Sequence, residues 1–452
     1  MSALEYEGIW KIPGYKDLEL YGKLVIDDTI KLNIKGALPL SLENESINII
    51  HGYTDNGKLI TLVDSININS SINFHGTFRY TYKSKFVFIG KLFNNLDELN
   101  IYSISSRYTY LEEWINIYGF NAEFNKSENF EINLKYKLPN SIKYKLQSFD
   151  LDINFRAKTK GDLRDCFTIN QSAFVTFSNI KNNLFDICID NIIELSKFMT
   201  LCIGKNVKFY DVKIKDNRGN IIEFYTSSYK NNKEVEVKKL MEHEIFIPYK
   251  YIEGELGQCI LQWYDIKDKL KPIINYFIDI CDINYYEPIT FIKAIQALET
   301  FSRRILVNCK DDENVHNKRV EYIISSINNQ EYREWLEKRL EFSNEPSLSN
   351  RIAYILKETK FILNINEKRR KSLIKKLVDT RNYYTHFDES KKDKIMNGEE
   401  IIWSTNYIII LLKVLVMNEL GIDREIIKRR ISEGYRESQI INRFSEVFKI
   451  NS

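Results

Sequence analysis

The sequence lacks the features that define several large classes of protein. Its six cysteines lie far apart and form no CxxC pair, which excludes a zinc knuckle or redox motif and disfavours a disulfide framework in a chain of 452 residues. They are expected to be small buried apolar residues. With 44% hydrophobic and 28% charged residues and only 7 prolines, the chain is neither disordered nor collagen-like.

Signals for export and membrane insertion are also scarce. The first residues, MSALEYEGIW, lack the basic-then-apolar pattern of a signal peptide. The longest apolar stretch, Tyr407–Val416, is interrupted by Lys413 and is too short to span a bilayer, so it predicts a buried core helix. We therefore expect a cytoplasmic protein without membrane contact. Lys and Arg number 65 against 62 Asp and Glu, so any surface that binds nucleic acid must be local.

The first half of the chain has the period of β-strands. Ile47–Tyr53 and Leu59–Val63 flank Asn56-Gly57, a pair typical of tight hairpins. A second hairpin is expected between Val207–Ile214 and Ile221–Tyr225. A few helices are expected here, notably Leu111–Tyr118 and Asp186–Leu201.

From about residue 253 the apolar residues recur at helical spacing. Pro288 can open one helix, and Pro346-Ser-Leu-Ser precedes another. We expect about six or seven helices with short connections after residue 287, which is a bundle. The prediction is an α+β multidomain protein with a mostly β domain at 1–240, a helical connector with one long helix at 241–286, and an all-α bundle at 287–452.

Histidine is rare, and four of the five, His51, His75, His243 and His316, have no convincing partner in the sequence. No HxH or HExxH motif and no Cys–His cluster occurs, so we expect neither a transition-metal site nor a cofactor.

The fifth histidine ends the run Leu373-Ile-Lys-Lys-Leu-Val-Asp-Thr-Arg-Asn-Tyr-Tyr-Thr-His386. Arg381 continues the apolar stripe of this helix, and its permanent charge needs an anionic partner: a carboxylate, a subunit contact or a phosphate. His386 lies about 140° further round a straight helix. The two can converge if the helix ends near Thr385, or across a two-fold axis. Asn382 can share a face with His386 and orient the imidazole or contact a ligand.

The same region is locally basic. From Phe361 to Lys394 the chain has ten Lys or Arg, including Lys375 and Lys376, against five Asp or Glu. This surplus suits a groove for a phosphate backbone, although a solvated helix face would have the same composition. Tyr383 and Tyr384 could stack on bases or serve only as packing.

A helical bundle carrying Arg381-Asn-Tyr-Tyr-Thr-His386 resembles the HEPN ribonucleases, whose signature is Arg, four to six residues, then His. The chain is also similar to the ApeA-type branch of this family. In the bundle, the segments that carry this similarity are Phe291–Arg304 and Leu348–Leu356. In the first half it lies in Gly8–Pro13, Leu20–Asp27, Ile50–Leu62, Phe88–Gly90 and Ser103–Ile115. Trp10 and Trp114, within these segments, are expected to be core residues.

The resemblance implies a protein of anti-phage defence that acts by abortive infection. Its helical domain would cut host RNA, with transfer RNA one candidate substrate, without metal, and would be toxic to the infected cell. Arg381 and His386 would be the catalytic pair with Asn382 as their polar neighbour. On local charge and aromatic content, Tyr383, Tyr384, Lys375 and Lys376 are the residues expected to contact RNA. A dimer, at least two-fold, through the helical domain and a phage-encoded trigger are also implied. From the two-part architecture we further expect the β domain or the connector to restrain or open the site.

Two other functions are compatible with the sequence. One is a non-catalytic module that binds nucleotides, RNA or proteins, in which Arg381 and His386 form a structural contact. The other is a ligand-binding β domain with a structural helical tail. Glu299 resembles a helix-borne acidic residue of the ApeA branch, and an ordinary ion pair with Arg303 is its alternative role.

Overall fold

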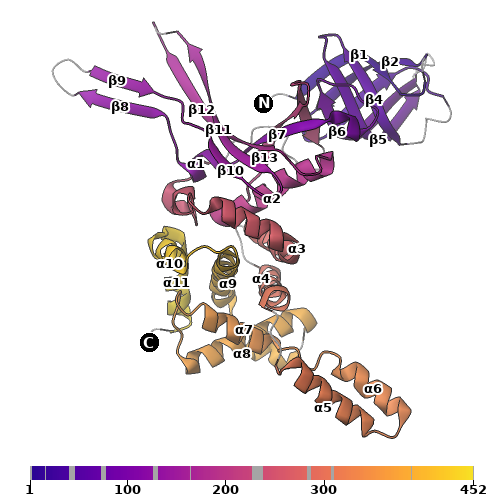
Figure 1. The fold of residues 1–452 in the computed structure, drawn as a ribbon. Coiled ribbons are helices and arrows are strands. Elements are labelled where there is room, and N and C mark those ends of the chain that lie inside the picture. The colour runs from indigo at the N-terminus through magenta and orange to yellow at the C-terminus, as the bar shows by residue number, and fades with distance from the viewer. Residues whose placement is uncertain are drawn as a thin grey trace. The chain divides into compact units, whose positions relative to one another are not determined.

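The computed structural model describes residues 3–15, 17–39, 46–72, 78–125, 131–162, 164–226, 238–281, 287–306, 310–387 and 389–450. The chain divides into two compact units. The first comprises Met1–Met199, Val207–Glu242 and Pro248–Lys250, and the second comprises Thr200–Asn206, His243–Ile247 and Tyr251–Ser452. The first is mainly β and the second is helical (Figure 1), which confirms the predicted α+β fold class. The domain bounds at 240 and 286 stay a prediction.

Six antiparallel strands of the first unit close into a barrel. They follow one another in the order β6, β3, β2, β1, β4, β5, and β5 pairs back onto β6. In β3 the buried side chains of Ile30, Leu32 and Ile34 alternate with exposed ones, as a period of two requires. The barrel strands are β1 (Leu4–Lys11), β2 (Glu19–Ile26), β3 (Ile30–Lys35), β4 (Ile47–Thr54), β5 (Leu59–Ile72) and β6 (Phe78–Ile89).

The first predicted hairpin is confirmed in this barrel. Strands β4 and β5 pair in antiparallel register around Asn56-Gly57. Gly57 has φ +77°, which favours glycine, and its N–H donates a hydrogen bond of 2.9 Å to the carbonyl of Thr54. The turn therefore fixes the register that points the apolar residues of both strands into the barrel.

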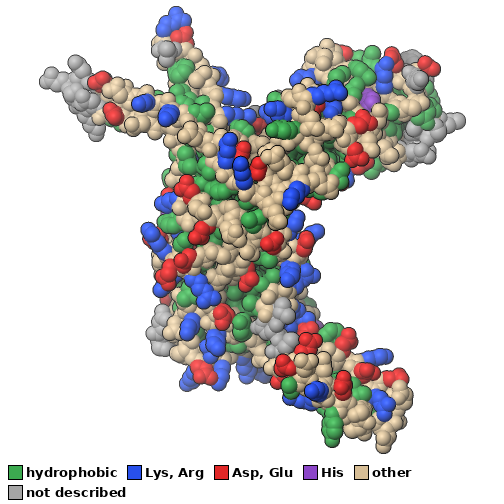
Figure 2. All heavy atoms as spheres, viewed as in Figure 1, with side chains coloured by type: hydrophobic (Ala, Val, Ile, Leu, Met, Phe, Trp, Pro, Cys, Tyr) green, Lys and Arg blue, Asp and Glu red, His purple; other side chains and the backbone are tan. Residues whose placement is uncertain are grey.

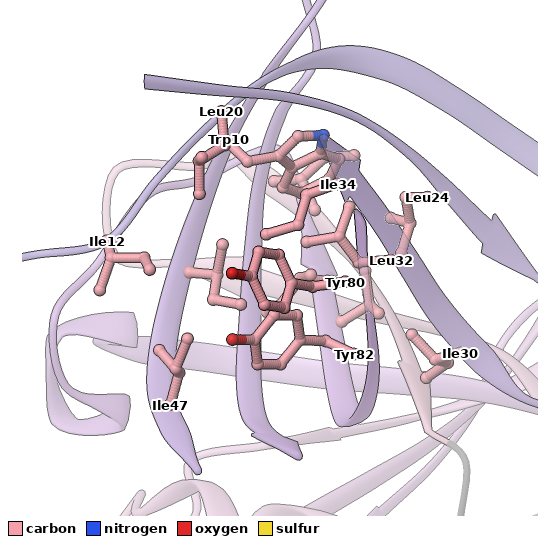
Figure 3. Packing of buried hydrophobic residues seen from close by; sticks show 14 of the residues in the cluster. Trp10, Ile12, Leu20, Leu24, Ile30, Leu32, Ile34, Ile47, Tyr80 and Tyr82 are labelled. Atoms are coloured by element: carbon pink, nitrogen blue, oxygen red, sulfur yellow. The ribbon is translucent and has the colours of Figure 1, made fainter. Parts of the chain in front are cut away.

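The indole of Trp10 and the rings of Tyr80 and Tyr82 lie in the barrel core, with Ile34 between Trp10 and the tyrosines in the view of Figure 3. Trp10 is fully buried, and its Nε1–H donates a hydrogen bond of 3.0 Å to the carbonyl of Gly22. A Cβ atom at Gly52 would overlap the indole ring, so a glycine is required there. The structure confirms Trp10 as a core residue.

Strand β6 belongs to the barrel and also to a second, open part of the sheet. Its residues 79–83 pair with β3, whereas Phe86–Ile89 pair with β14. From β14 the sheet continues through β13, β7, β12, β11 and β10. The second predicted hairpin is thus confirmed as β13–β14. The strands are β7 (Ile101–Tyr108), β10 (Ile142–Lys145), β11 (Asp150–Gly161), β12 (Phe167–Ser178), β13 (Phe209–Asp216) and β14 (Ile221–Thr226).

Helices cover one face of this open sheet. Phe185, at the start of α2 (Phe185–Ile203), packs against Phe88 and Phe224 with ring centroids 5.3 and 5.2 Å apart. Helix α1 (Leu111–Ile115) is shorter than the predicted 111–118, because Asn116 adopts a left-handed conformation and caps it. Trp114 in α1 is buried, as predicted. Strands β8 (Phe120–Asn125) and β9 (Glu131–Tyr136) form a separate ribbon.

The second unit contains the long helix expected in the connector and a helical bundle. Pro288 opens α4 at its first turn, as predicted, and a helix, α7, begins within Pro346-Ser-Leu-Ser, where the Ser347 side chain is its N-cap. The helices are α3 (Leu256–Cys281), α4 (Pro288–Phe301), α5 (Glu313–Ser325), α6 (Gln330–Leu340), α7 (Leu348–Glu358), α8 (Glu367–His386), α9 (Gly398–Glu419), α10 (Arg424–Glu433) and α11 (Tyr435–Val447). Over the two units together, shorter helical turns lie at Leu96–Leu99, Glu242–Glu244, Tyr249–Tyr251, Ser302–Leu306 and Glu389–Lys394.

The expected number of six or seven helices after residue 287 was too low, because the described residues form eight α-helices there, α4 to α11. Helices α5 and α6 form a hairpin that projects from the bundle (Figure 1) and contain no buried residue. Their visible surface mixes charges of both signs (Figure 2). Without a buried face, these helices show little apolar periodicity in the sequence. Helices α10 and α11 are separated only by Gly434.

Helix α9 contains the apolar stretch Tyr407–Val416 and lies in the core of the second unit, as predicted. It is the one helix of the described residues that is long and apolar enough to cross a membrane, but 89% of its apolar window is buried inside the structure. Lys413, which interrupts the stretch, forms a buried ion pair of 3.1 Å with Glu437. Pairing removes most of the cost of placing its ammonium in the core.

Replacement of Trp10 by alanine should lower the free energy of unfolding of the first unit by about 3–5 kcal/mol, because it leaves a cavity in the barrel. Trp335→Ala is the matched control, since Trp335 on α6 is 59% exposed and should change this free energy by less than about 0.5 kcal/mol. Urea unfolding followed by circular dichroism measures both. Similar losses in the two variants would contradict the assignment of Trp10 to the core.

The cysteines are not uniformly buried. Three of them are buried, as expected: Cys188, Cys202 and Cys259. Cys166 is exposed, so the expectation of burial was wrong for that residue. It lies in a short connection before β12, where the chain offers no core to bury it. Cys281 and Cys309 lie outside the residues whose side chains are described. Burial raises the pKa of Cys188 to about 12 and that of Cys259 to about 11.

Because the thiolate is the reactive form, a raised pKa lowers reactivity at pH 8. Iodoacetamide should therefore label Cys166 in the folded protein within minutes and leave Cys188, Cys202 and Cys259 largely unmodified until the protein is unfolded. Peptide mass spectrometry reads each site separately. Rapid labelling of Cys259 in the folded state would contradict the predicted protection.

Candidate active site

The candidate residues lie on the last turns of helix α8. The helix begins where the Asn366 side chain accepts a hydrogen bond from the backbone N–H of Arg369, and Leu373, Ile374 and Leu377 bury its apolar face. It ends when Phe387 adopts a left-handed conformation, with φ 50°, and donates its N–H to the carbonyl of Tyr383 at 2.6 Å. Arg381 through His386 are therefore all helical.

Arg381 is held by two contacts within its own chain. Its Nη2 lies 3.7 Å from Oε2 of Glu299, in the last turn of α4, and its Nη1 donates a hydrogen bond of 3.0 Å to Oδ1 of Asn382. The Arg381 side chain is 24% exposed. Its Nε is buried and has no hydrogen-bond partner among the residues that the structure describes. Of the three anionic partners considered from the sequence, the structure contains the carboxylate.

Glu299 does not neutralise Arg381 alone, because it is one member of a chain of ion pairs. Its Oε1 lies 3.3 Å from Arg303, which in turn lies 2.9 Å from Glu345, and Glu345 lies 3.0 Å from the buried Arg351. Three arginines thus share two carboxylates, which leaves one positive charge in excess. The alternative role considered for Glu299, an ion pair with Arg303, is therefore present together with its contact to Arg381.

His386 is exposed at the last position of the helix. Because α8 continues past Thr385, it does not end early enough to turn His386 toward Arg381, and the two lie about 140° apart around the helix. Lys375, Asn382 and His386 instead lie within about 20° of a common face. One chain therefore presents the arginine and the histidine in different directions.

Asn382 contacts Arg381 rather than His386. Its Oδ1 accepts the hydrogen bond from Arg381, and no hydrogen bond to His386 occurs among the described residues. Tyr383 and Tyr384 are half-buried and pack edge to face, with ring centroids 5.1 Å apart. Phe387, which the sequence did not single out, is 68% exposed directly after the helix, and its ring lies 6.1 Å from that of Tyr383.

The two lysines proposed from the sequence have different surroundings. Lys375 is exposed, and no carboxylate forms an ion pair with it among the described residues. Lys376 pairs with Glu400, whose carboxylate also accepts the backbone N–H of Asn397 in the capping box of α9. Lys391 likewise lies 3.8 Å from Asp379. Part of the basic run is thus already compensated within the chain.

Two family models match the chain. The model described as ApeA N-terminal domain 1 matches residues 5–263, and the model described as ApeA-like HEPN matches residues 292–426. Because the first covers more than half of the chain, the protein belongs to the ApeA family, with an ApeA N-terminal domain followed by a HEPN domain. No curated protein and no solved structure gives a significant match.

The matched HEPN region contains Glu299, Arg381, Asn382 and His386. HEPN domains are typically ribonucleases, and their combination with an ApeA N-terminal domain indicates a role in anti-phage defence. Sequence reasoning named Glu299 but could not predict its contact with Arg381, because the contact joins two helices distant in the chain. The sequence offered only one indication of this contact, namely that Glu299 is an acidic residue on a predicted helix of the same domain as Arg381.

If Glu299 fixes Arg381, Glu299→Gln should lower the free energy of unfolding of the second unit by about 1 kcal/mol, since the partly buried Arg381 and the exposed Arg303 lose a shared carboxylate. Glu367→Gln is the matched control. It is the same substitution, but the ion pair that it removes, with Lys371, is exposed to solvent. Urea unfolding compares the variants. Equal midpoints for the wild type and both variants would show that Glu299 does not hold Arg381.

Proposed function

We propose that this protein is a metal-independent HEPN endoribonuclease of anti-phage defence, with Arg381 and His386 as its catalytic pair. The observation that carries the proposal is the state of Arg381. Its guanidinium is positioned by Glu299 and Asn382, remains under-neutralised, and keeps an unpartnered Nε among the described residues. A buried donor without a partner requires a physical explanation, and a phosphate oxygen would supply the missing acceptor here. The exposed His386 supplies a group that can move protons at neutral pH.

The reaction needs only proton transfer and charge stabilisation, because RNA contains its own nucleophile. His386 removes the proton of a 2′-hydroxyl, whose oxygen attacks the adjacent phosphorus. Arg381 binds the phosphate and stabilises the negative charge that develops on its oxygens. The bond from phosphorus to the 5′-oxygen breaks, and this oxygen takes up a proton. The products are a 2′,3′-cyclic phosphate and a 5′-hydroxyl.

The helix geometry leads us to propose a two-fold dimer as the active form. Within one chain, Arg381 and His386 point about 140° apart. A two-fold axis near the end of α8 would bring His386 of each copy toward Arg381 of the other, because an isologous contact places the same residues on both sides. The shared cleft would then contain two histidines, one to accept a proton and one to donate it.

The exposed face of α8 is suited to the RNA strand. Lys375 lies on the same face as His386 and is the better candidate for a phosphate contact, since Lys376 pairs with Glu400. Tyr383 and Tyr384, together with Phe387, offer rings on which unpaired bases can stack. A single-stranded loop satisfies these requirements better than a duplex, because its bases can be splayed out.

In the cell, we propose that the enzyme acts in the cytoplasm on host RNA, with transfer RNA a candidate substrate, after a phage-encoded trigger. Cleavage would stop growth of the infected cell before phage is released. The first unit would then be the part that restrains or opens the nuclease.

The test is incubation of purified wild type, His386→Ala and His316→Ala with total bacterial RNA, with and without EDTA. His316, on α5, is the control for loss of an imidazole. Wild type and His316→Ala should cut RNA equally in EDTA and leave cyclic phosphate ends, whereas His386→Ala should be at least about 10²-fold slower. Thermal unfolding of the three proteins checks that they fold alike.

Cleavage that requires a metal and is unchanged in His386→Ala would contradict the proposal. If all three proteins leave RNA intact, the assay is repeated in cells infected with phage, where the trigger is present. Survival and RNA integrity that do not differ between wild type and His386→Ala in those cells would favour the binding-only function.

A further inference from the structure

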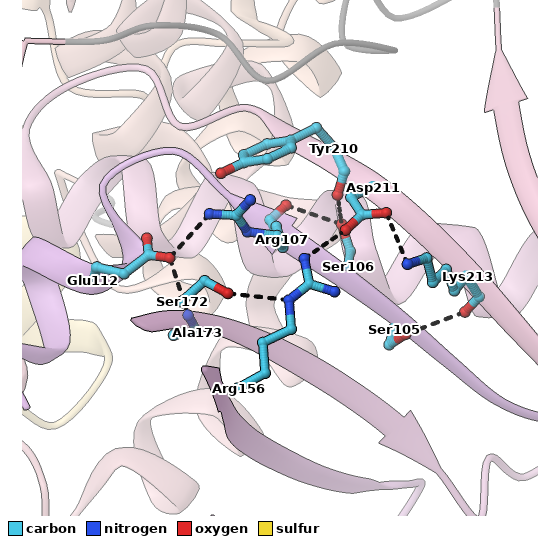
Figure 4. A network of polar contacts seen from close by, with 10 residues as sticks. All are labelled: Ser105, Ser106, Arg107, Glu112, Arg156, Ser172, Ala173, Tyr210, Asp211 and Lys213. Carbon is cyan, nitrogen blue, oxygen red and sulfur yellow. Dashed lines mark hydrogen bonds and ion pairs between the residues drawn. The ribbon is translucent and has the colours of Figure 1, made fainter. Parts of the chain in front are cut away.

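The first unit contains a pocket far along the sequence from α8. It has a volume of about 540 Å³ and lies on one face of the open sheet, where alternate residues of β7, β11, β12 and β13 line it. This volume is within the range of about 300–1,000 Å³ that small-molecule sites occupy. Figure 4 shows the polar side chains that gather there from these strands.

The lining of the pocket is strongly biased toward positive charge. Four cations, Arg107, Arg156, Lys213 and Lys215, line it together with one carboxylate, Asp211. The neutral polar groups in the lining come from Ser103, Ser105, Asn154 and Thr176. The Asn154 amide already donates to the Asp152 carbonyl and to Thr176 Oγ1, and the Ser105 hydroxyl donates to the Lys213 carbonyl. The cations therefore supply most of the donors that an anion would meet.

Asp211 is placed by an irregularity in β13. The register of β13 against β7 shifts between Tyr210 and Lys213, and Asp211 has φ 52°, a left-handed conformation that is rare for a residue other than glycine. In this position its two carboxylate oxygens divide between two cations: Oδ2 lies 2.9 Å from Arg156 and Oδ1 lies 3.3 Å from Lys213. The single negative charge of Asp211 therefore cannot neutralise both Arg156 and Lys213.

The guanidinium groups of the pocket are held in fixed orientations (Figure 4). Arg156 also donates from Nε to Ser172 at 3.0 Å. Arg107 pairs with Glu112 at 3.2 Å, and its guanidinium lies 4.8 Å from the ring centre of Tyr210. Because these side chains are already ordered, they lose little conformational entropy when a ligand binds.

Lys215 has no ion-pair partner among the residues that the structure describes. Its Nζ lies 5.9 Å from the ring centre of Tyr102. Glu223, opposite Lys213 in the neighbouring strand, accepts a hydrogen bond from Tyr225 and does not line the pocket. With Arg107 neutralised by Glu112, the lining retains an excess of two positive charges.

We propose that this pocket binds a small ligand that carries two or more phosphate groups. The excess positive charge and the fixed guanidinium groups together match the requirements of a polyphosphate. The ligand is a small molecule rather than a nucleic-acid strand, because the cations converge on a hollow whose volume is that of a small-molecule site. Nucleoside polyphosphates and free polyphosphate share this chemistry. The inference does not depend on the proposed nuclease.

The test is isothermal titration of the full-length protein with pyrophosphate and with ATP, both in EDTA. Saturable binding of one molecule per chain is expected, weaker at high salt. Lys215→Gln should weaken binding at least about tenfold, because it removes a charged donor that no carboxylate holds. Lys58→Gln is the control for the loss of one exposed lysine, because Lys58 lies in the β4–β5 turn and does not line the pocket. This variant should bind both probes as the wild type does.

ATP binding tighter than pyrophosphate would identify a nucleoside polyphosphate, and equal binding would identify the phosphate groups alone as the recognised part. The proposal is overturned if neither probe binds at 1 mM, a concentration of the order at which weak specific sites saturate. It is also overturned if Lys215→Gln and Lys58→Gln bind equally well. Preferential binding of a uridine hexanucleotide that Lys215→Gln abolishes would overturn the small-molecule class in favour of an RNA surface.

Discussion

The chemistry proposed for α8 depends on one constraint, the permanent charge of Arg381. An arginine cannot deprotonate in a protein, so a partly buried guanidinium must be paired. Glu299 supplies the carboxylate but shares it with Arg303, and the chain of pairs continues to the buried Arg351 through Glu345. The result is an arginine that is firmly positioned and still incompletely neutralised, which is the state that a phosphate-binding group requires.

A second constraint is the pitch of the helix. Five residues turn an α-helix by about 140°, so the spacing of Arg381 and His386 separates their side chains as long as the helix stays regular. It does stay regular, because the left-handed residue that ends α8 is Phe387. The same pitch aligns Lys375, Asn382 and His386 on an exposed face. We therefore propose that the pair acts between two chains rather than within one.

The sequence predicted the features that depend on local chemistry. It did not predict the features that depend on contacts between residues far apart in the chain. Asn56-Gly57 predicted a hairpin and Pro288 a helix start, because each residue imposes its own backbone conformation. Helices α5 and α6 were not separated in advance, since they bury no face and lack apolar periodicity. The partner of Arg381 and the left-handed Asp211 result from packing between segments far apart in the chain, which no local pattern records.

The most direct test of the two-chain site is complementation between inactive variants. Arg381→Ala and His386→Ala chains are each purified, then mixed and allowed to exchange subunits before incubation with RNA. If the site joins Arg381 of one copy to His386 of the other, mixed dimers contain one intact pair and cleave RNA, although neither variant alone does. If the mixture stays as inactive as its two components while mass spectrometry confirms mixed dimers, the shared cleft is contradicted.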